Sequence, residues 1–148
     1  MNEQWALADD ETFLAAVEEA AWPGECFGHR EHVRLAWMYL RRHGLEAGSA
    51  RIRDTIQRYA TALGAPGKYH ETLTWAWCVY VDHALRGPSR CETFPAFLEA
   101  NPELLDSRLL ARHYQRETLD APEARRERMA PDLAPLPSGA RPSSQRSP

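Results

Sequence analysis

Histidines are the residues whose type and spacing point most directly to chemistry in this chain. His29 and His32 lie three residues apart, so both rings fall on one face if the segment is helical. His70 follows a loop rich in Gly and Pro and opens the next predicted helix, so a short connection can place it beside them. Three imidazoles with an open position are typical of catalytic zinc sites. The spacing therefore predicts a metal site with His29, His32 and His70 as ligands.

Two glutamates stand next to these histidines in the sequence. Glu31 lies between His29 and His32, and Glu71 follows His70. A carboxylate in such a place can orient a ligand or accept a proton, so both are candidate catalytic residues. We therefore predict one transition-metal ion (zinc, copper or iron) in a small metal-dependent enzyme that acts on a small-molecule substrate. Hydrolytic and redox chemistry both remain open.

The other histidines are less suited to this site. His43 lies fourteen residues from His29 and His83 lies thirteen residues from His70, which is roughly 20 Å along a helix in each case at 1.5 Å per residue. We expect them to be structural or surface residues. Cys26, three residues before His29, could add a thiolate ligand, and His113 could add an imidazole.

A structural interpretation of the histidines competes with the metal hypothesis. A buried histidine is more often a hydrogen-bonded core residue than a ligand, and a short H-x-x-H recurs by chance. The alternative is a non-catalytic helical interaction module that serves a partner or a second copy in a homodimer. A third hypothesis is haem binding through one axial histidine. The sequence contains no H-E-x-x-H, P-loop, G-x-S-x-G or G-x-G-x-x-G motif.

Helical periodicity runs through most of the chain, and no segment alternates with period two. The stretch from Thr72 to Val81 has no charge, which indicates a central helix. Ser49 is a candidate cap for the third helix, and Gly44 is expected to end the second. The predicted fold is all-α, a compact bundle of about four main helices and one or two short ones. The expected helices run from Asp9 or Asp10 to about residue 22, then over 29–43, 49–63, 71–85, 93–100 and 107–116.

The composition changes after residue 116, because six of the eleven prolines lie between Pro122 and Pro148. We expect a helical bundle domain over 1–116, an extended proline-rich strap packed on it over 117–137, and a disordered tail over 138–148.

Bulk properties restrict the class of protein. The chain has 148 residues and a net charge of −3, which suits one domain and gives no indication of a nucleic-acid or membrane partner. Three cysteines without a C-x-x-C pair fit a reduced setting, and the N-terminal segment is too polar for a signal peptide. The sequence therefore predicts a cytoplasmic protein.

Three segments resemble motifs of an uncharacterised family of small bacterial proteins. They are Phe27–His32 (F-G-H-R-E-H), Tyr69–Thr74 (Y-H-E-T-L-T) and Pro131–Pro137 (P-D-L-A-P-L-P). The resemblance spans about residues 25–137 and implies that these segments belong to one site. Gly28 stands where a small hydroxyl residue would be more usual as a helix cap, which leaves the start of that helix less defined.

Overall fold

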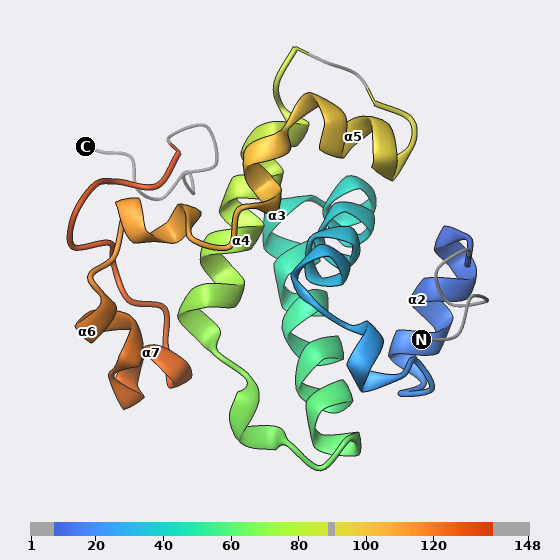
Figure 1. The fold of residues 1–148 in the computed structure, drawn as a ribbon, viewed down its shortest axis with the longest axis horizontal. Coiled ribbons are helices and arrows are strands. Elements are labelled where there is room, and N and C mark those ends of the chain that lie inside the picture. Colours follow the sequence, from blue (N-terminus) through green and yellow to red (C-terminus); the bar gives the residue numbers. More distant parts are fainter. Residues whose placement is uncertain (1–7, 89–90, 138–148) are drawn as a thin grey trace.

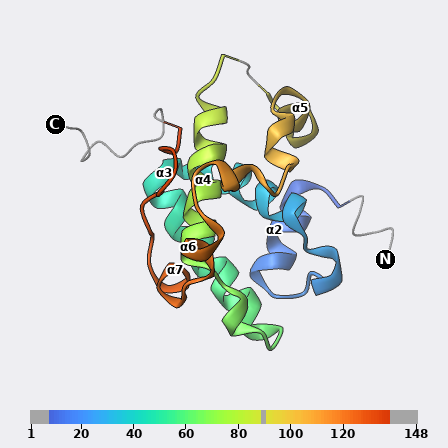
Figure 2. The same ribbon diagram turned by 60° about the vertical axis from the view of Figure 1, so that its left-hand side comes forward.

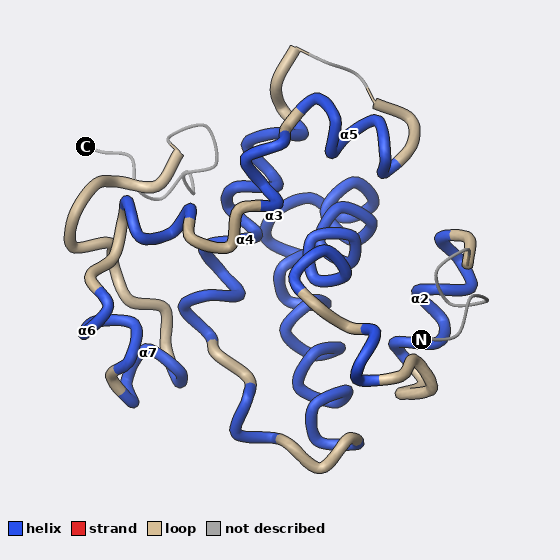
Figure 3. Tube along the Cα trace, viewed as in Figure 1, coloured by secondary structure: helices blue, strands red, loops and turns tan. Residues whose placement is uncertain are grey.

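The fold is all-α over residues 8–88 and 91–137, the part of the chain that the computed structural model describes (Figures 1 and 3). No strand occurs in that part, so the predicted fold class is confirmed. None of the helices described there is long and apolar enough to cross a membrane. The four helices of seven residues or more are α2 (Asp10–Glu18), α3 (His29–Ala62), α4 (Glu71–Leu85) and α5 (Phe94–Ala100).

Helix α2 begins at one of the two predicted caps. The Asp9 carboxylate accepts a hydrogen bond from the Thr12 N–H at 2.8 Å, which satisfies one of the free donors of the first turn. The helix buries Phe13 and Val17 and packs on α3, and it ends at Glu18, earlier than the sequence predicts.

The long helix α3 contains the second and third predicted helices, joined at Gly44. Gly44 has φ 82° and ψ 178°, a conformation that is almost restricted to glycine, so the predicted break is confirmed. The predicted cap at Ser49 is wrong. The second half of α3 continues directly after Gly44, so Ser49 is buried one turn inside it, where its hydroxyl donates to the Glu46 carbonyl.

Helix α4 lies at the centre of the molecule, between α3 and the C-terminal segment (Figure 2). Its bounds are those that the sequence predicts. Ala76, Cys78, Val79 and Val81 are buried, as expected of an uncharged stretch. Because α4 packs against elements on both sides, it fixes the positions of the side chains at its N-terminal end, which include His70 and Glu71.

The predicted helix over 107–116 is wrong. The Asp106 carboxylate accepts a hydrogen bond from the Arg108 N–H at 3.0 Å, which favours a turn over a regular helix. The 3-10 turn η4 (Leu109–Arg112) follows. Three further 3-10 turns complete the connections, and they are η1 (Gly24–Cys26), η2 (Pro66–Lys68) and η3 (Pro102–Leu105).

Two one-turn helices occupy the start of the segment that was expected to be extended. They are α6 (Arg116–Asp120) and α7 (Pro122–Arg126), at the left of Figure 1. The chain from 127 to 137 is not helical, and it is held on α4 by Thr72. The Thr72 hydroxyl donates to the Glu127 carbonyl at 2.7 Å and accepts from the Met129 N–H at 3.0 Å.

The division of the chain into a bundle domain and a strap stays a prediction. The predicted disordered tail lies outside the described residues.

Candidate ligand-binding site

A mainly apolar cavity of about 410 Å³ is lined by the first turns of α3 and α4. All three histidines that were predicted as metal ligands line it. Side chains from the second half of α3 and from the loop before η4 complete the wall. The lining residues are Phe27, Gly28, His29, His32, Ala36, Ile52, Ile56, Lys68, Tyr69, His70, Leu73, Thr74, Trp77, Cys78 and Ser107.

Aromatic rings form part of the cavity wall. The His29 and Trp77 rings lie with their centroids 4.4 Å apart. The Phe27 ring meets His32 edge to face at 4.6 Å, and it also contacts Tyr59. These contacts hold the imidazoles of His29 and His32 in fixed orientations beside the cavity, because each ring is packed against a larger neighbour.

His70 uses both of its ring nitrogens to hold the fold together. Its Nδ1 accepts a hydrogen bond from the Leu73 N–H at 3.1 Å, so His70 is the N-cap of α4. Its Nε2 donates to the Leu119 carbonyl at 2.8 Å. This pattern requires a neutral ring with the proton on Nε2. A metal ion could bind His70 only if one of these two hydrogen bonds were lost.

His29 and His32 each keep one ring nitrogen free of hydrogen bonds within the described residues. His29 Nε2 donates to the Leu104 carbonyl at 2.8 Å, which leaves Nδ1 as an acceptor. His32 Nδ1 is 3.3 Å from the Gly28 carbonyl and donates to it, which leaves Nε2 as an acceptor. The polar chemistry available to a ligand in the cavity therefore includes these two nitrogens.

The protonation state of His32 follows from its surroundings. Burial lowers the pKa of His32 to about 4, against the raising effect of the hydrogen bond to Gly28, and the neighbouring His29 lowers it further. The ring is therefore neutral at pH 7. General bases work best when their pKa lies near the working pH, so His32 is better suited to accept a hydrogen bond or bind a metal than to remove a proton.

Glu31, one of the two candidate catalytic residues, serves as part of a helix cap. Its Oε1 accepts a hydrogen bond from the Gly28 N–H at 2.9 Å, which is the second half of a capping box. The start of this helix, which the sequence left less defined, is therefore clear in the structure. Helix α3 begins at His29, and Gly28 is its N-cap. Glu31 does not line the cavity.

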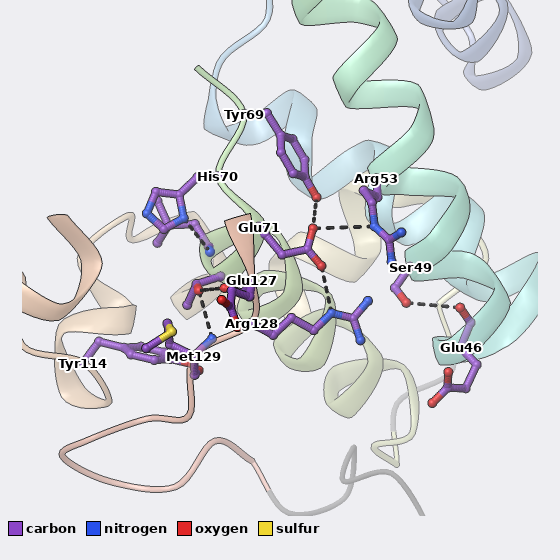
Figure 4. A network of polar contacts seen from close by, with 12 residues as sticks. Glu46, Ser49, Arg53, Tyr69, His70, Glu71, Tyr114, Glu127, Arg128 and Met129 are labelled. Atoms are coloured by element: carbon purple, nitrogen blue, oxygen red, sulfur yellow. Dashed lines mark hydrogen bonds and ion pairs between the residues drawn. The ribbon is translucent and has the colours of Figure 1, made fainter. Parts of the chain in front are cut away.

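Glu71, the other candidate, does not line the cavity and lies in a cluster of polar groups (Figure 4). Its carboxylate accepts from the Tyr69 hydroxyl at 2.5 Å and from Arg128 Nε at 3.0 Å, and Arg53 Nε lies 3.5 Å away. Burial and the hydrogen bond to Glu71 raise the pKa of Tyr69, so its phenol stays protonated. The carboxylate thereby joins α3, α4 and the C-terminal segment. A role in proton transfer stays a prediction for both glutamates.

The remaining candidate ligands lie elsewhere or are engaged. Cys26 is buried in the core and does not line the cavity. His113 donates from Nδ1 to the Ala134 carbonyl, and its Nε2 accepts from the Tyr80 hydroxyl. Burial raises the pKa of Cys78, which does line the cavity, to about 12, so its thiol is protonated and a poor nucleophile.

Within residues 8–88 and 91–137, no three His, Cys, Asp or Glu side chains form a group that could hold a metal ion. The three histidines line one cavity, but hydrogen bonds engage both ring nitrogens of His70 and one ring nitrogen each of His29 and His32. Sequence reasoning also missed two polar lining residues, Lys68 and Ser107. Lys68 had a signal that could have found it, since it is the single lysine of the chain and stands two residues before His70.

We expect Glu71→Gln to lower the free energy of unfolding by about 1–3 kcal/mol, because both arginines lose their anionic partner. This loss of stability should be smaller than that caused by breaking a fully buried ion pair, because the side chains of Arg53 and Arg128 are 41% and 34% exposed. Urea unfolding measures the change, and Glu99→Gln, at an exposed glutamate of α5, is the control. Unchanged stability for Glu71→Gln would contradict the structural role.

No protein-family model, curated protein or solved structure matches this chain. The resemblance to a family of small bacterial proteins therefore stays a prediction, and the site has to be interpreted from its own geometry.

Proposed function

We propose that this protein binds a small, mainly apolar molecule in the histidine-lined cavity and that His32 accepts a hydrogen bond from it. The observation that carries this proposal is the combination of an apolar cavity with two imidazoles whose free nitrogens have no partner in the described part of the chain. Small-molecule sites are typically mainly apolar clefts with a few placed polar groups.

The size and walls of the cavity favour a ligand of one or two rings. A volume of about 410 Å³ falls within the usual range for small-molecule sites. Trp77, Phe27 and the two imidazoles offer flat faces and edges against which a planar molecule can pack. Removing such a molecule from water supplies most of the binding free energy.

The free nitrogens define the polar group of the ligand. A neutral imidazole nitrogen without a proton accepts a hydrogen bond, so the matching ligand group is an N–H or O–H donor. His32 Nε2 is held in this state at pH 7 because the pKa of the ring is lowered to about 4. The site therefore selects an apolar ring that carries a donor.

Indole is a suitable neutral probe, because it combines an apolar ring system with one N–H. We expect indole to bind about fivefold more tightly than N-methylindole, which lacks the donor, since one hydrogen bond in a partly dry site contributes about 1 kcal/mol. His32→Phe should remove this difference. Isothermal titration calorimetry measures the affinities, and His83→Phe, at an exposed histidine of α4, is the control.

Equal affinity for the two indoles in the wild type would contradict the role of His32. If neither compound binds, the cavity is not a small-molecule site, and the alternative of a non-catalytic interaction module with structural histidines becomes the better account. In that case His32→Phe would change stability alone.

A transition metal at His29 and His32 is a second candidate, and it would keep the protein in the class of metal-dependent enzymes. The observation that favours it is that the two residues stand three apart on one helix, line one cavity and each leave one nitrogen free. Catalytic zinc sites generally have three protein ligands. His70 would have to give up a hydrogen bond to Leu73 or Leu119 to become the third.

Elemental analysis after dialysis against zinc, cupric or ferrous ions tests the metal candidate directly. The metal hypothesis predicts about one ion per chain in the wild type and its loss in the His29→Ala/His32→Ala double variant. The matched control is His43→Ala/His83→Ala, which removes two exposed histidines. Equal metal content in the two double variants would show that any bound ion is held at another place.

A further inference from the structure

We infer that the natural ligand of the histidine cavity is an anion, an apolar ring bearing a carboxylate or a similar group that pairs with Lys68. This inference rests on the proposed small-molecule site and adds the charge of the ligand. The observation behind it is the uneven distribution of charge around the cavity. None of its fifteen lining residues is Asp or Glu, whereas one of them, Lys68, is a basic residue.

Lys68 is not committed to another partner. It is the last residue of η2, its side chain is exposed, and no carboxylate of the described residues forms an ion pair with it. Lys68 thus combines an exposed side chain with a place beside the apolar walls of the cavity. A ligand could therefore bury its ring while its charged group remains near water, which avoids the cost of burying an ion.

The neighbouring cations are engaged and do not compete for this role. Arg53 and Arg128 flank the Glu71 carboxylate. Arg125 donates to the backbone carbonyls of Gly67 and Tyr69, on either side of Lys68. These contacts fix the loop that carries Lys68 and leave the lysine as the one cation that lines the cavity.

The histidines do not offset this preference for an anion. His70 is neutral, because its Nδ1 accepts from the Leu73 N–H while its Nε2 donates. His32 is also neutral at pH 7, because burial lowers its pKa to about 4, so these two rings leave Lys68 to set the charge beside the cavity.

Three indoles that differ in the charge of the side chain test the inference. They are indole-3-acetate, which is an anion, 3-ethylindole, which is neutral, and tryptamine, which is a cation. At low ionic strength we expect indole-3-acetate to bind about fivefold more tightly than 3-ethylindole, with tryptamine the weakest. This preference should shrink as salt is added, because exposed charges are screened.

Substitutions of Lys68 test whether this residue causes the preference for the anion. Lys68→Met keeps most of the length of the side chain without its charge and should abolish the preference for the anion, whereas Lys68→Arg should keep it. Arg51→Met, at an exposed arginine of α3 that does not line the cavity, is the control and should bind as the wild type does. Calorimetry provides the affinities for each pair of protein and probe.

The outcomes separate the two proposals. If the three probes bind with equal affinity, or if Lys68→Met keeps the preference for the anion, the inference is overturned while the small-molecule site stands. If no probe binds, the inference falls together with the proposed function.

Discussion

The first turn of α4 is the constraint on which the rest of the structure depends, because three consecutive residues there join separate parts of the chain. His70 caps the helix and donates to the Leu119 carbonyl of α6. Glu71 connects α3 with the C-terminal segment through two arginines, and Thr72 makes two hydrogen bonds to the backbone of that segment. Since a buried polar group without a partner costs free energy, the loss of any of these contacts would destabilise the fold. They hold α4 between α3 and the segment that follows α6.

This arrangement determines which groups remain available for a ligand. The histidine and the glutamate of that first turn are used to hold the fold, so the free imidazole nitrogens beside the cavity come from the start of α3. His29 and His32 each direct one nitrogen to a backbone carbonyl and leave the other without a partner in the described residues. The hydrogen bonds to carbonyls hold the two rings in place, and the free nitrogens provide a small number of acceptors. Small-molecule sites typically combine such a preformed wall with a few polar groups.

Local signals predicted most of the main helices, and distant contacts explain why the role of His70 was not predicted. The uncharged stretch predicted the central place of α4, and glycine predicted the break in α3, because both effects act within a few residues. Helical spacing also brought His29 and His32 to one cavity. The partners of His70 could not be predicted in the same way. Leu119 lies 49 residues away in sequence, and its carbonyl has no side-chain signature that would identify it as an acceptor.

The central claim is that hydrogen bonds and burial fix which ring nitrogens of His70 and His32 carry a proton. Nitrogen-15 NMR of the imidazoles tests this claim most directly, because it shows for each ring which nitrogen is protonated. The structure predicts that His70 is neutral with its proton on Nε2, and that His32 is neutral with its proton on Nδ1 and stays so as the pH falls from 7 to 5. Unfolded His32 has a pKa near 6.5, so protonation of the unfolded state should reduce stability over that range. A His70 ring with its proton on Nδ1, or a His32 ring that titrates near pH 6.5, would contradict this account.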